Sequence, residues 1–308
     1  MASGSATARP LSVLDTLSVC MIVKNEEQVL PACLESVRDL AGEIVVVDTG
    51  STDATSRLAA AFGANLFSFD FSTVDFAAAR NYAIARARGR WILMLDADET
   101  LDPACREIVA QLVTANENVD ENSGYFLERH NQGADPQSAF TDYVVRLFPN
   151  RLNYRYRGRV HETIDASILA AGGRLQQTSI RIDHKFSCDP QARRRRNLRY
   201  IEILKEEIAA DPTDTSRLDF LAAEYHQLEM FEHATAVAED IALLRPLDPR
   251  AHLFVGVYHL LYKPDLPRAR ADFMQALKLR PGYAEAESFL GLTEEREKKS
   301  RQTEAQAK

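Results

Sequence analysis

Three aspartates follow two short apolar runs in the first third of the chain. The run at 43–47 (EIVVV) leads into Asp48, and the run at 91–95 (WILML) leads into Asp96 and Asp98, which flank one alanine. Because ligands of open α/β sheets bind beyond the carboxyl ends of the strands, these acids are predicted to share one edge. Hard cations such as Mg²⁺ and Mn²⁺ usually take one or two carboxylates together with phosphate oxygens. The pattern therefore predicts a site for a divalent metal and a phosphate-bearing ligand.

This set of carboxylates suits the release of a diphosphate. A nucleotide-sugar releases a diphosphate that carries several negative charges, and a divalent cation stabilises this leaving group as a Lewis acid. Two carboxylates at positions i and i+2 of a turn can reach one ligand complex, with one near the ribose and one on the metal. The competing interpretation is structural: Asp48, Asp96 and Asp98 would then only cap or shape turns.

Strand and helix patterns alternate along the first half of the chain. Apolar runs predict buried strands, and apolar residues at helical spacing predict helices between them. This alternation is typical of an α/β domain with a mainly parallel sheet. The predicted strands are 17–23, 43–47, 65–69, 91–95, 124–130, 143–148 and 174–182, and the clearest helices before residue 120 are 28–40 and 75–88.

From Arg193 onward the pattern is helical and repeats. Pro212, Pro246 and Pro281 are 34 and 35 residues apart, and alanines stand twelve residues before the second and third of these prolines. A period near 34 with small residues at helix crossings resembles the tetratricopeptide repeat. Two repeats flanked by a half repeat at each end are expected, so the fold class is an α/β sheet domain followed by an all-α helical-repeat tail.

Residues 17–101 resemble the family-2 glycosyltransferases of the GT-A fold. The motifs that carry the resemblance stand in the family's order at 18–27 (SVCMIVKNEE), 43–55 (EIVVVDTGSTDAT), 79–82 (ARNY) and 95–99 (LDADE). The resemblance extends over roughly the first 190 residues. The helical tail resembles a bacterial subgroup that joins the two parts, which includes enzymes that glycosylate peptides or proteins.

The resemblance implies an inverting transfer of a hexosyl or N-acetylhexosaminyl group from a nucleotide-sugar, with UDP as the expected nucleotide. It implies that the loop from Val23 through Asn25 to Glu26 lies over the base. By the same resemblance, Asp48 holds the base or ribose, Arg80 lies near the base and diphosphate, Asp96 and Asp98 form the DxD pair, and Asp98 is the ligand of Mn²⁺ or Mg²⁺.

An inverting displacement also needs a general base to take the proton of the acceptor. The segment 157–163 (RGRVHET) offers Glu162 as the first choice and His161 as the second. The family's usual Glu-Asp base motif is not evident, and a hydrogen-bonded His-Glu pair of purely structural role is an equal alternative. His184 is a candidate third metal ligand, although a lone histidine is more often structural. With Cys188 nearby, a zinc site would still have only two candidate ligands.

Composition limits the remaining possibilities. The chain has 308 residues and a net charge of −8, which argues against general binding of nucleic acid. The expected domains are a flexible tail at 1–16, the catalytic domain at 17–190, the helical domain at 191–298 and a disordered tail at 299–308. No run approaches the roughly 18 apolar residues of a membrane-spanning helix, and no signal peptide is evident, so a cytoplasmic location is expected.

Two other functions compete with the transferase. A sugar nucleotidyltransferase would place a glycine-rich, basic loop after the first strand, but residues 24–27 (KNEE) contain no glycine. A catalytically inactive scaffold would act only through its helical repeats. Such a protein would be expected to lose the acids at the carboxyl ends of its strands, whereas Asp48, Asp96 and Asp98 are all present. The acceptor, whether a peptide, a protein or a glycan, stays open, and the helical tail is expected to dock the acceptor, bind a protein partner or self-associate.

Overall fold

The structure is a computed structural model, and it describes residues 16–114, 122–133, 139–185 and 189–306. The chain divides into two compact units, Met1–Cys188 and Asp189–Lys308. This division lies close to the one expected at residue 190.

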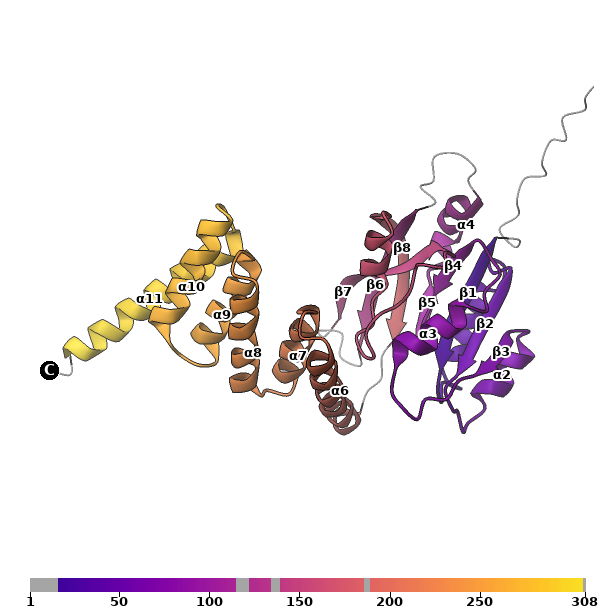
Figure 1. The fold of residues 1–308 in the computed structure, drawn as a ribbon, viewed down its shortest axis with the longest axis horizontal. Coiled ribbons are helices and arrows are strands. Elements are labelled where there is room, and N and C mark those ends of the chain that lie inside the picture. The colour runs from indigo at the N-terminus through magenta and orange to yellow at the C-terminus, as the bar shows by residue number, and fades with distance from the viewer. Residues whose placement is uncertain (1–15, 115–121, 134–138, 186–188, 307–308) are drawn as a thin grey trace, which may run out of the picture. The chain divides into compact units, whose positions relative to one another are not determined.

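The first unit is built on a mixed sheet of eight strands, which run in the order β3-β2-β1-β4-β7-β6-β8-β5 (Figure 1). The neighbours among β1 to β4 are parallel, and β7 then joins β4 in the antiparallel sense. The strands are β1 (Leu17–Val23), β2 (Glu43–Asp48), β3 (Asn65–Ser68), β4 (Trp91–Met94), β5 (Glu99–Leu101), β6 (Ser123–Gln132), β7 (Phe140–Pro149) and β8 (Arg174–Lys185).

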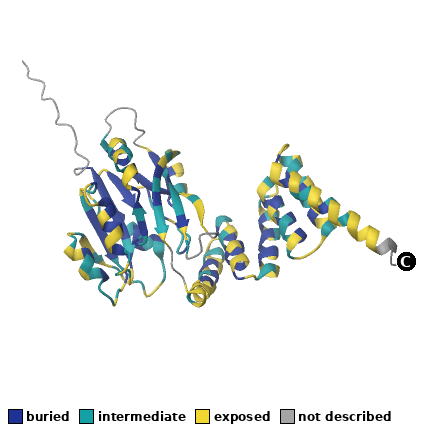
Figure 2. Cartoon of the chain, turned by 180° about the vertical axis from the view of Figure 1, so that it is seen from behind, coloured by how far each residue is buried: buried dark blue, intermediate teal, exposed yellow. Residues whose placement is uncertain are grey.

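Both faces of the central strands are buried, which explains why their sequences are apolar runs rather than alternating patterns. Along β1, Val19 and Met21 belong to one core cluster, whereas Cys20 between them belongs to the other. Helices α1 (Leu30–Val37), α2 (Thr55–Ala61) and α4 (Arg106–Thr114) contribute to the first cluster, and α3 (Phe76–Ile84) and α5 (Asp165–Ala170) to the second. Figure 2 shows these strands as the buried centre of the unit.

Capping side chains set two of the helix starts. The Asp75 side chain accepts a hydrogen bond from the Ala78 N–H at the start of α3, and Asp102 caps the short 3₁₀ turn Pro103–Cys105. Two elements were not predicted, because β5 and α5 are only three and six residues long and so show too little periodicity.

The second unit consists of consecutive helices, as the repeat predicted. They are α6 (Pro190–Ala210), α7 (Ser216–Gln227), α8 (Phe231–Leu244), α9 (Pro249–Leu261), α10 (Leu266–Leu279) and α11 (Ala284–Gln306). The pairs α7/α8 and α9/α10 are the two repeats, and α6 and α11 flank them. Small residues permit the close crossings: Ala234 and Ala269 are fully buried, and a Cβ on Gly256 would lie 2.6 Å from the Phe273 ring.

Two predictions about the chain ends need correction. Residues 299–306 were expected to be disordered, but α11 continues through them to Gln306. Lys, Arg, Glu and Gln are good helix formers, and Arg301 pairs with Glu297 at i and i+4. At the other end, residues 1–15 lie outside the described residues. Thr16, expected in the flexible tail, is buried, and its carbonyl accepts the Trp91 N–H.

Candidate active site

Strands β1, β2 and β4 are parallel neighbours and end on the same side of the sheet (Figure 1). The predicted acids lie at or directly after the carboxyl ends of β2 and β4. Val23 and Asp48 are paired at the ends of β1 and β2. The chain leaves β4 through Asp96 and Asp98 and turns into β5, whose first residue pairs with His184 of β8. The sheet therefore brings Asp48, the DxD pair and His184 to the same edge.

Two loops at this edge are joined by hydrogen bonds. Asn25 accepts from the Thr52 N–H through Oδ1 at 2.7 Å and donates its own N–H to Ser51 Oγ at 3.0 Å. The N–H of Glu26 donates to Thr55 Oγ1 at 2.7 Å. Asn25 has a φ of +58°, a conformation that asparagine tolerates better than most residues. The loop expected to lie over the base is thus fixed, whereas the Val23 side chain itself is buried in the core.

Asp48 is held as a charged carboxylate. Its Oδ1 accepts from the N–H groups of Gly50 and Ser51 at 3.1 and 2.8 Å, and its Oδ2 accepts from the Ser56 hydroxyl. Burial raises the pKa of Asp48, but these hydrogen bonds outweigh burial and leave its pKa below the usual range. An ionised acceptor at the end of β2 suits the predicted contact with a ribose or base.

Asp96 lies between two buried arginines. Arg80 Nη2 is 2.7 Å from Asp96 Oδ1, and Arg146 Nη2 is 2.5 Å from Asp96 Oδ2. Burial raises the pKa of Asp96, but Arg146 and Arg80 together hold that pKa far below its usual range. Each oxygen of the Asp96 carboxylate therefore contacts a guanidinium group. Asp98 is the acid of the DxD pair that we expect to bind a cation.

The same cluster contains donors without a partner. Arg80 Nη1, Arg146 Nε and the Tyr156 hydroxyl are buried and make no hydrogen bond to the described residues. Buried polar atoms in native proteins are normally satisfied, so such donors call for an explanation. An anionic ligand such as a diphosphate would satisfy them, and the cluster fits a phosphate-bearing molecule on this ground.

Asp98 faces His184. The Asp98 Oδ2 and His184 Nε2 atoms are 3.1 Å apart, and the two side chains are 32% and 20% exposed. Among the described residues, no three His, Cys, Asp or Glu side chains are grouped to hold a metal by themselves. One carboxylate and one imidazole fit Mn²⁺ better than Mg²⁺, because Mg²⁺ prefers oxygen ligands alone, and the rest of the shell would come from phosphate oxygens and water.

The two candidate bases lie in a turn closed by Arg157 and Thr163, whose backbones exchange hydrogen bonds of 2.9 and 3.1 Å. Glu162 Oε1 is 2.6 Å from Arg80 Nε, and the side chain is 11% exposed. Arg80 thereby brings Glu162 into the cluster with Asp96. His161 has a φ of +50°, a strained conformation for a residue other than glycine that is often found at functional sites.

Sequence reasoning missed Glu99 and Arg146. Glu99 is fully buried, accepts the Asp96 N–H through Oε2 at 3.0 Å, and pairs with Arg146 at 2.7 Å. Arg146 belongs to the otherwise apolar run 144–148 (VVRLF) in β7. A single charge inside a buried strand is the signal that could have identified Arg146, since such a charge must find a partner.

Glu26 is the acid of the site whose charge the fold disfavours. Burial, followed by the negative charges of Asp98, Asp53 and Asp96, raises the pKa of Glu26 to about 7. The folded protein therefore holds the Glu26 proton more tightly than the unfolded chain does. This difference favours the folded state below the unfolded pKa of 4.5, and the contribution is lost as pH rises through about 7.

We therefore expect Glu26→Gln to stabilise the protein at pH 8 and to change little at pH 5. The full pKa shift corresponds to about 3 kcal/mol, and screening at this half-buried position reduces the expected gain to about 1 kcal/mol. Urea unfolding at the two pH values measures the difference, with the exposed Glu35→Gln as the control. An equal effect of Glu26→Gln at both pH values would contradict the assignment.

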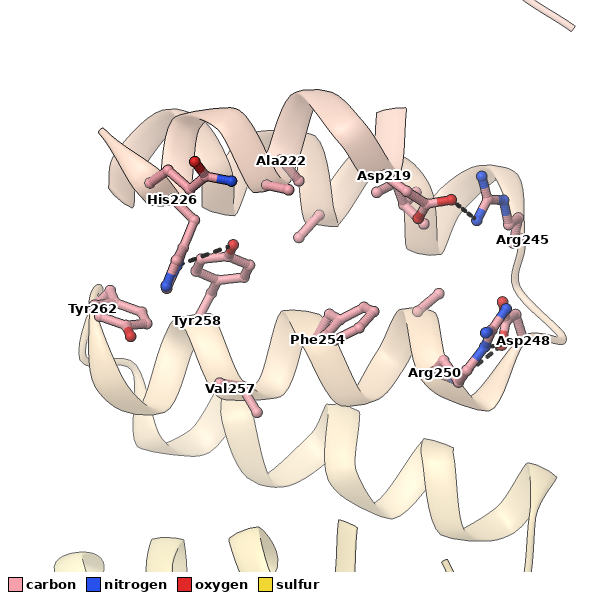
Figure 3. A pocket seen from close by; sticks show the side chains of 15 residues that line it. Asp219, Ala222, His226, Arg245, Asp248, Arg250, Phe254, Val257, Tyr258 and Tyr262 are labelled. Atoms are coloured by element: carbon pink, nitrogen blue, oxygen red, sulfur yellow. Dashed lines mark hydrogen bonds and ion pairs between the residues drawn. The ribbon is translucent and has the colours of Figure 1, made fainter. Parts of the chain in front are cut away.

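A separate cavity of about 670 Å³ lies within the helical unit, between helices α7, α8 and α9 (Figure 3). One end is aromatic, with His226, Tyr258 and Tyr262 in contact. At the other end Arg245 pairs with Asp219, and Arg250 with Asp248.

Within the described residues, no helix combines the length and apolar character needed to cross a bilayer.

Ligands of open α/β sheets bind beyond the carboxyl ends of the parallel strands, and the polar groups gathered there mark this place as the candidate ligand site of an α/β domain. The model of the family named Glycosyl transferase family 2 matches residues 18–175, about half of the chain. The chain therefore belongs to glycosyl transferase family 2.

The chain is also similar to two named relatives and to a solved structure. A TPR repeat-containing protein of Synechococcus elongatus is 43% identical over 156 residues, which cover 50% of this chain and 36% of that protein. The lipopolysaccharide core biosynthesis glycosyltransferase LpsC of Rhizobium meliloti is 35% identical over 156 residues, 48% of this chain and 56% of LpsC. The chain thus matches about half or less of these relatives' length. A crystal structure of S. aureus TarS 1-349 in complex with UDP-GlcNAc matches with a TM-score of 0.45 and 16% identity, over 92% of each chain.

Proposed function

We propose that the first unit is an inverting glycosyltransferase that moves a hexosyl or N-acetylhexosaminyl group from a UDP-sugar to an acceptor, with a divalent cation. The observation that carries the proposal is the pairing of Asp98 with His184 beside the Arg80–Asp96–Arg146 cluster at the carboxyl edge of the sheet. Membership of glycosyl transferase family 2 supports the reaction class. The choice of UDP follows the resemblance seen in the sequence.

In this proposal, each residue has a part set by its surroundings. Asp48 accepts hydrogen bonds from the ribose or base, under the fixed loop that holds Asn25 and Glu26. Asp98 and His184 hold the cation, which would neutralise charge on the departing diphosphate. Arg80 keeps Asp96 ionised and offers its Nη1 atom, which has no hydrogen-bond partner among the described residues, to a phosphate oxygen.

The transfer is a single displacement. The acceptor oxygen forms a bond to the anomeric carbon of the sugar while the bond from that carbon to the diphosphate oxygen breaks on the opposite face. The bonding electrons leave with the diphosphate, and the acceptor proton goes to a carboxylate of the protein. Glu162 is the proposed base, because its Oε1 is held by Arg80 and its Oε2 is left for the acceptor; His161 is the alternative.

The acceptor is proposed only as a class. The name of the rhizobial relative refers to the lipopolysaccharide core, which supports testing saccharide acceptors first and peptides second. The cavity of the helical unit is the proposed place for the acceptor or for a protein partner, because its aromatic end offers flat apolar surfaces and its other end offers charged groups.

The first experiment is a titration of the full chain with UDP, GDP and dTDP, with and without Mn²⁺. Binding is measured by calorimetry and by the change in melting temperature. A ligand that binds only the folded state adds about 2.7 kcal/mol of stability at one hundred times its Kd. We expect UDP to bind in a Mn²⁺-dependent way, after which UDP-sugars are screened for hydrolysis. If no nucleotide binds at millimolar concentration, the transferase proposal fails.

Replacement of Glu162 by glutamine tests the base. Glutamine can still accept from Arg80 but cannot take a proton, so kcat is expected to fall by about 10²- to 10⁴-fold while UDP affinity stays within a few-fold. Steady-state kinetics with the identified donor measure both quantities. If Glu162→Gln retains its kcat and His161→Gln loses it, His161 is the base instead.

A further inference from the structure

Asn131 lies directly behind the Asp98–His184 pair. It stands near the end of β6, is 3% exposed, and pairs in register with His184 on the parallel strand β8. Its Oδ1 atom is 2.7 Å from His184 Nδ1. Asn131 therefore contacts the imidazole on the side of the ring away from Asp98.

The orientation of the Asn131 amide is determined by its other neighbours. Its Nδ2 donates to Asp142 Oδ1 at 2.9 Å and to the carbonyl of Arg129 at 3.3 Å. Both of these groups only accept hydrogen bonds. If the amide were flipped, its oxygen would face these two acceptors with no hydrogen between them. The Arg129 guanidinium fixes Asp142 in turn, with contacts of 2.9 and 2.5 Å.

This orientation decides which nitrogen of His184 carries a proton. The amide oxygen of Asn131 can only accept, so Nδ1 of His184 must be the donor. Nε2 is then the nitrogen turned toward Asp98 Oδ2, at 3.1 Å. Histidines that bind metals typically donate their second ring N–H to such a fixed acceptor, which sets the tautomer and the angle of the ring.

We propose that Asn131 is a positioning residue that, held by Asp142, directs the Nε2 of His184 toward a divalent cation shared with Asp98. The inference rests on the proposed function, since it assumes that this pair binds the cation. Asn131 itself touches neither the cation nor the substrate. Its effect should therefore appear in cation affinity before it appears in any rate.

The test is the affinity of the full chain for Mn²⁺ in the presence of saturating UDP, measured from the electron paramagnetic resonance signal of free Mn²⁺. Asn131→Ala is expected to weaken Mn²⁺ binding by about 10- to 100-fold. The matched control is Asn150→Ala. Asn150 follows β7 at the opposite end of the sheet, where its amide donates to the carbonyls of Ala87 and Gly89 at 3.1 and 3.0 Å. This control should reduce melting temperature without changing Mn²⁺ affinity.

A double variant, Asn131→Asp with Asp142→Asn, tests the hydrogen bonds rather than the fold. It keeps the net charge, supplies a carboxylate oxygen at position 131 that accepts from His184 Nδ1, and supplies an amide at position 142 that donates to the new carboxylate. It is expected to recover part of the lost affinity, because the donor to the Arg129 carbonyl is not restored. Unchanged affinity in Asn131→Ala, an equal loss in Asn150→Ala, or no recovery in the double variant would each overturn the inference. If the unaltered protein binds no Mn²⁺ with UDP, the proposed metal site fails as well, and this result is distinct from the other three.

Discussion

Asp98→Asn is expected to abolish the Mn²⁺ dependence of UDP binding and to lower transfer by about a thousandfold. Asparagine keeps the size of the side chain but removes the charge that faces His184. A metal that acts as a Lewis acid supplies several kcal/mol of transition-state stabilisation, and about 4 kcal/mol corresponds to that factor. Calorimetry of UDP with and without Mn²⁺ measures the first effect, and donor hydrolysis or transfer measures the second.

Fold damage must be separated from this effect. Asp98 is about one-third exposed and its hydrogen-bonded side-chain partner is His184, so the melting temperature of Asp98→Asn should change little. Asp39→Asn is the control, because Asp39 is exposed between α1 and β2, at the other end of the strands. Mn²⁺-dependent UDP binding that survives in Asp98→Asn would refute the role given to this residue.

Arg146→Met is expected to destabilise the first unit by about 3 kcal/mol, because it leaves the buried Glu99 and the partly exposed Asp96 without their shared cation. Glu99 is fully buried, and Asp96 would keep only Arg80. A loss of this size lowers the melting temperature by roughly 10 °C in a unit of this length. Trp91, the single tryptophan of the chain, is buried in β4, so its fluorescence reports the unfolding of this unit alone.

A second substitution shows whether the loss comes from uncompensated charge. In Arg146→Met with Glu99→Gln, the buried carboxylate, which would keep only Arg129 at 3.4 Å, is replaced by a neutral amide, so part of the stability should return. Double-mutant cycles isolate such coupling when each single variant creates no new interaction. Strictly additive effects of the two substitutions would show that the Arg146–Glu99 pair contributes nothing specific.

The parts of the molecule that follow from local sequence were predictable. The apolar runs predicted β1, β2 and β4, and the acids after the runs of β2 and β4 were predicted at the carboxyl ends of the strands, where the structure has them. The period of the prolines predicted the paired helices of the second unit.

The parts that depend on strand register were not predictable. Arg146 reaches Asp96 because β7 inserts beside β4, and Asn131 reaches His184 because β6 pairs with β8. No local pattern encodes these neighbours, which are 50 and 53 residues apart in the chain. A buried charge or amide in a strand signals that a partner exists but does not identify it.

The place of β7 between β4 and β6 also affects how the protein is made. β4 is complete at Met94, yet the strand that covers its open side ends only at Pro149. At about 5–20 residues per second, the ribosome takes roughly 3 to 11 seconds to make the intervening segment. During that interval β4, with the sequence WILM, has unpaired backbone groups along one side, and another chain could pair with them. We therefore expect slow translation to increase aggregation of the nascent chain, and a chaperone bound near residue 95 to reduce it.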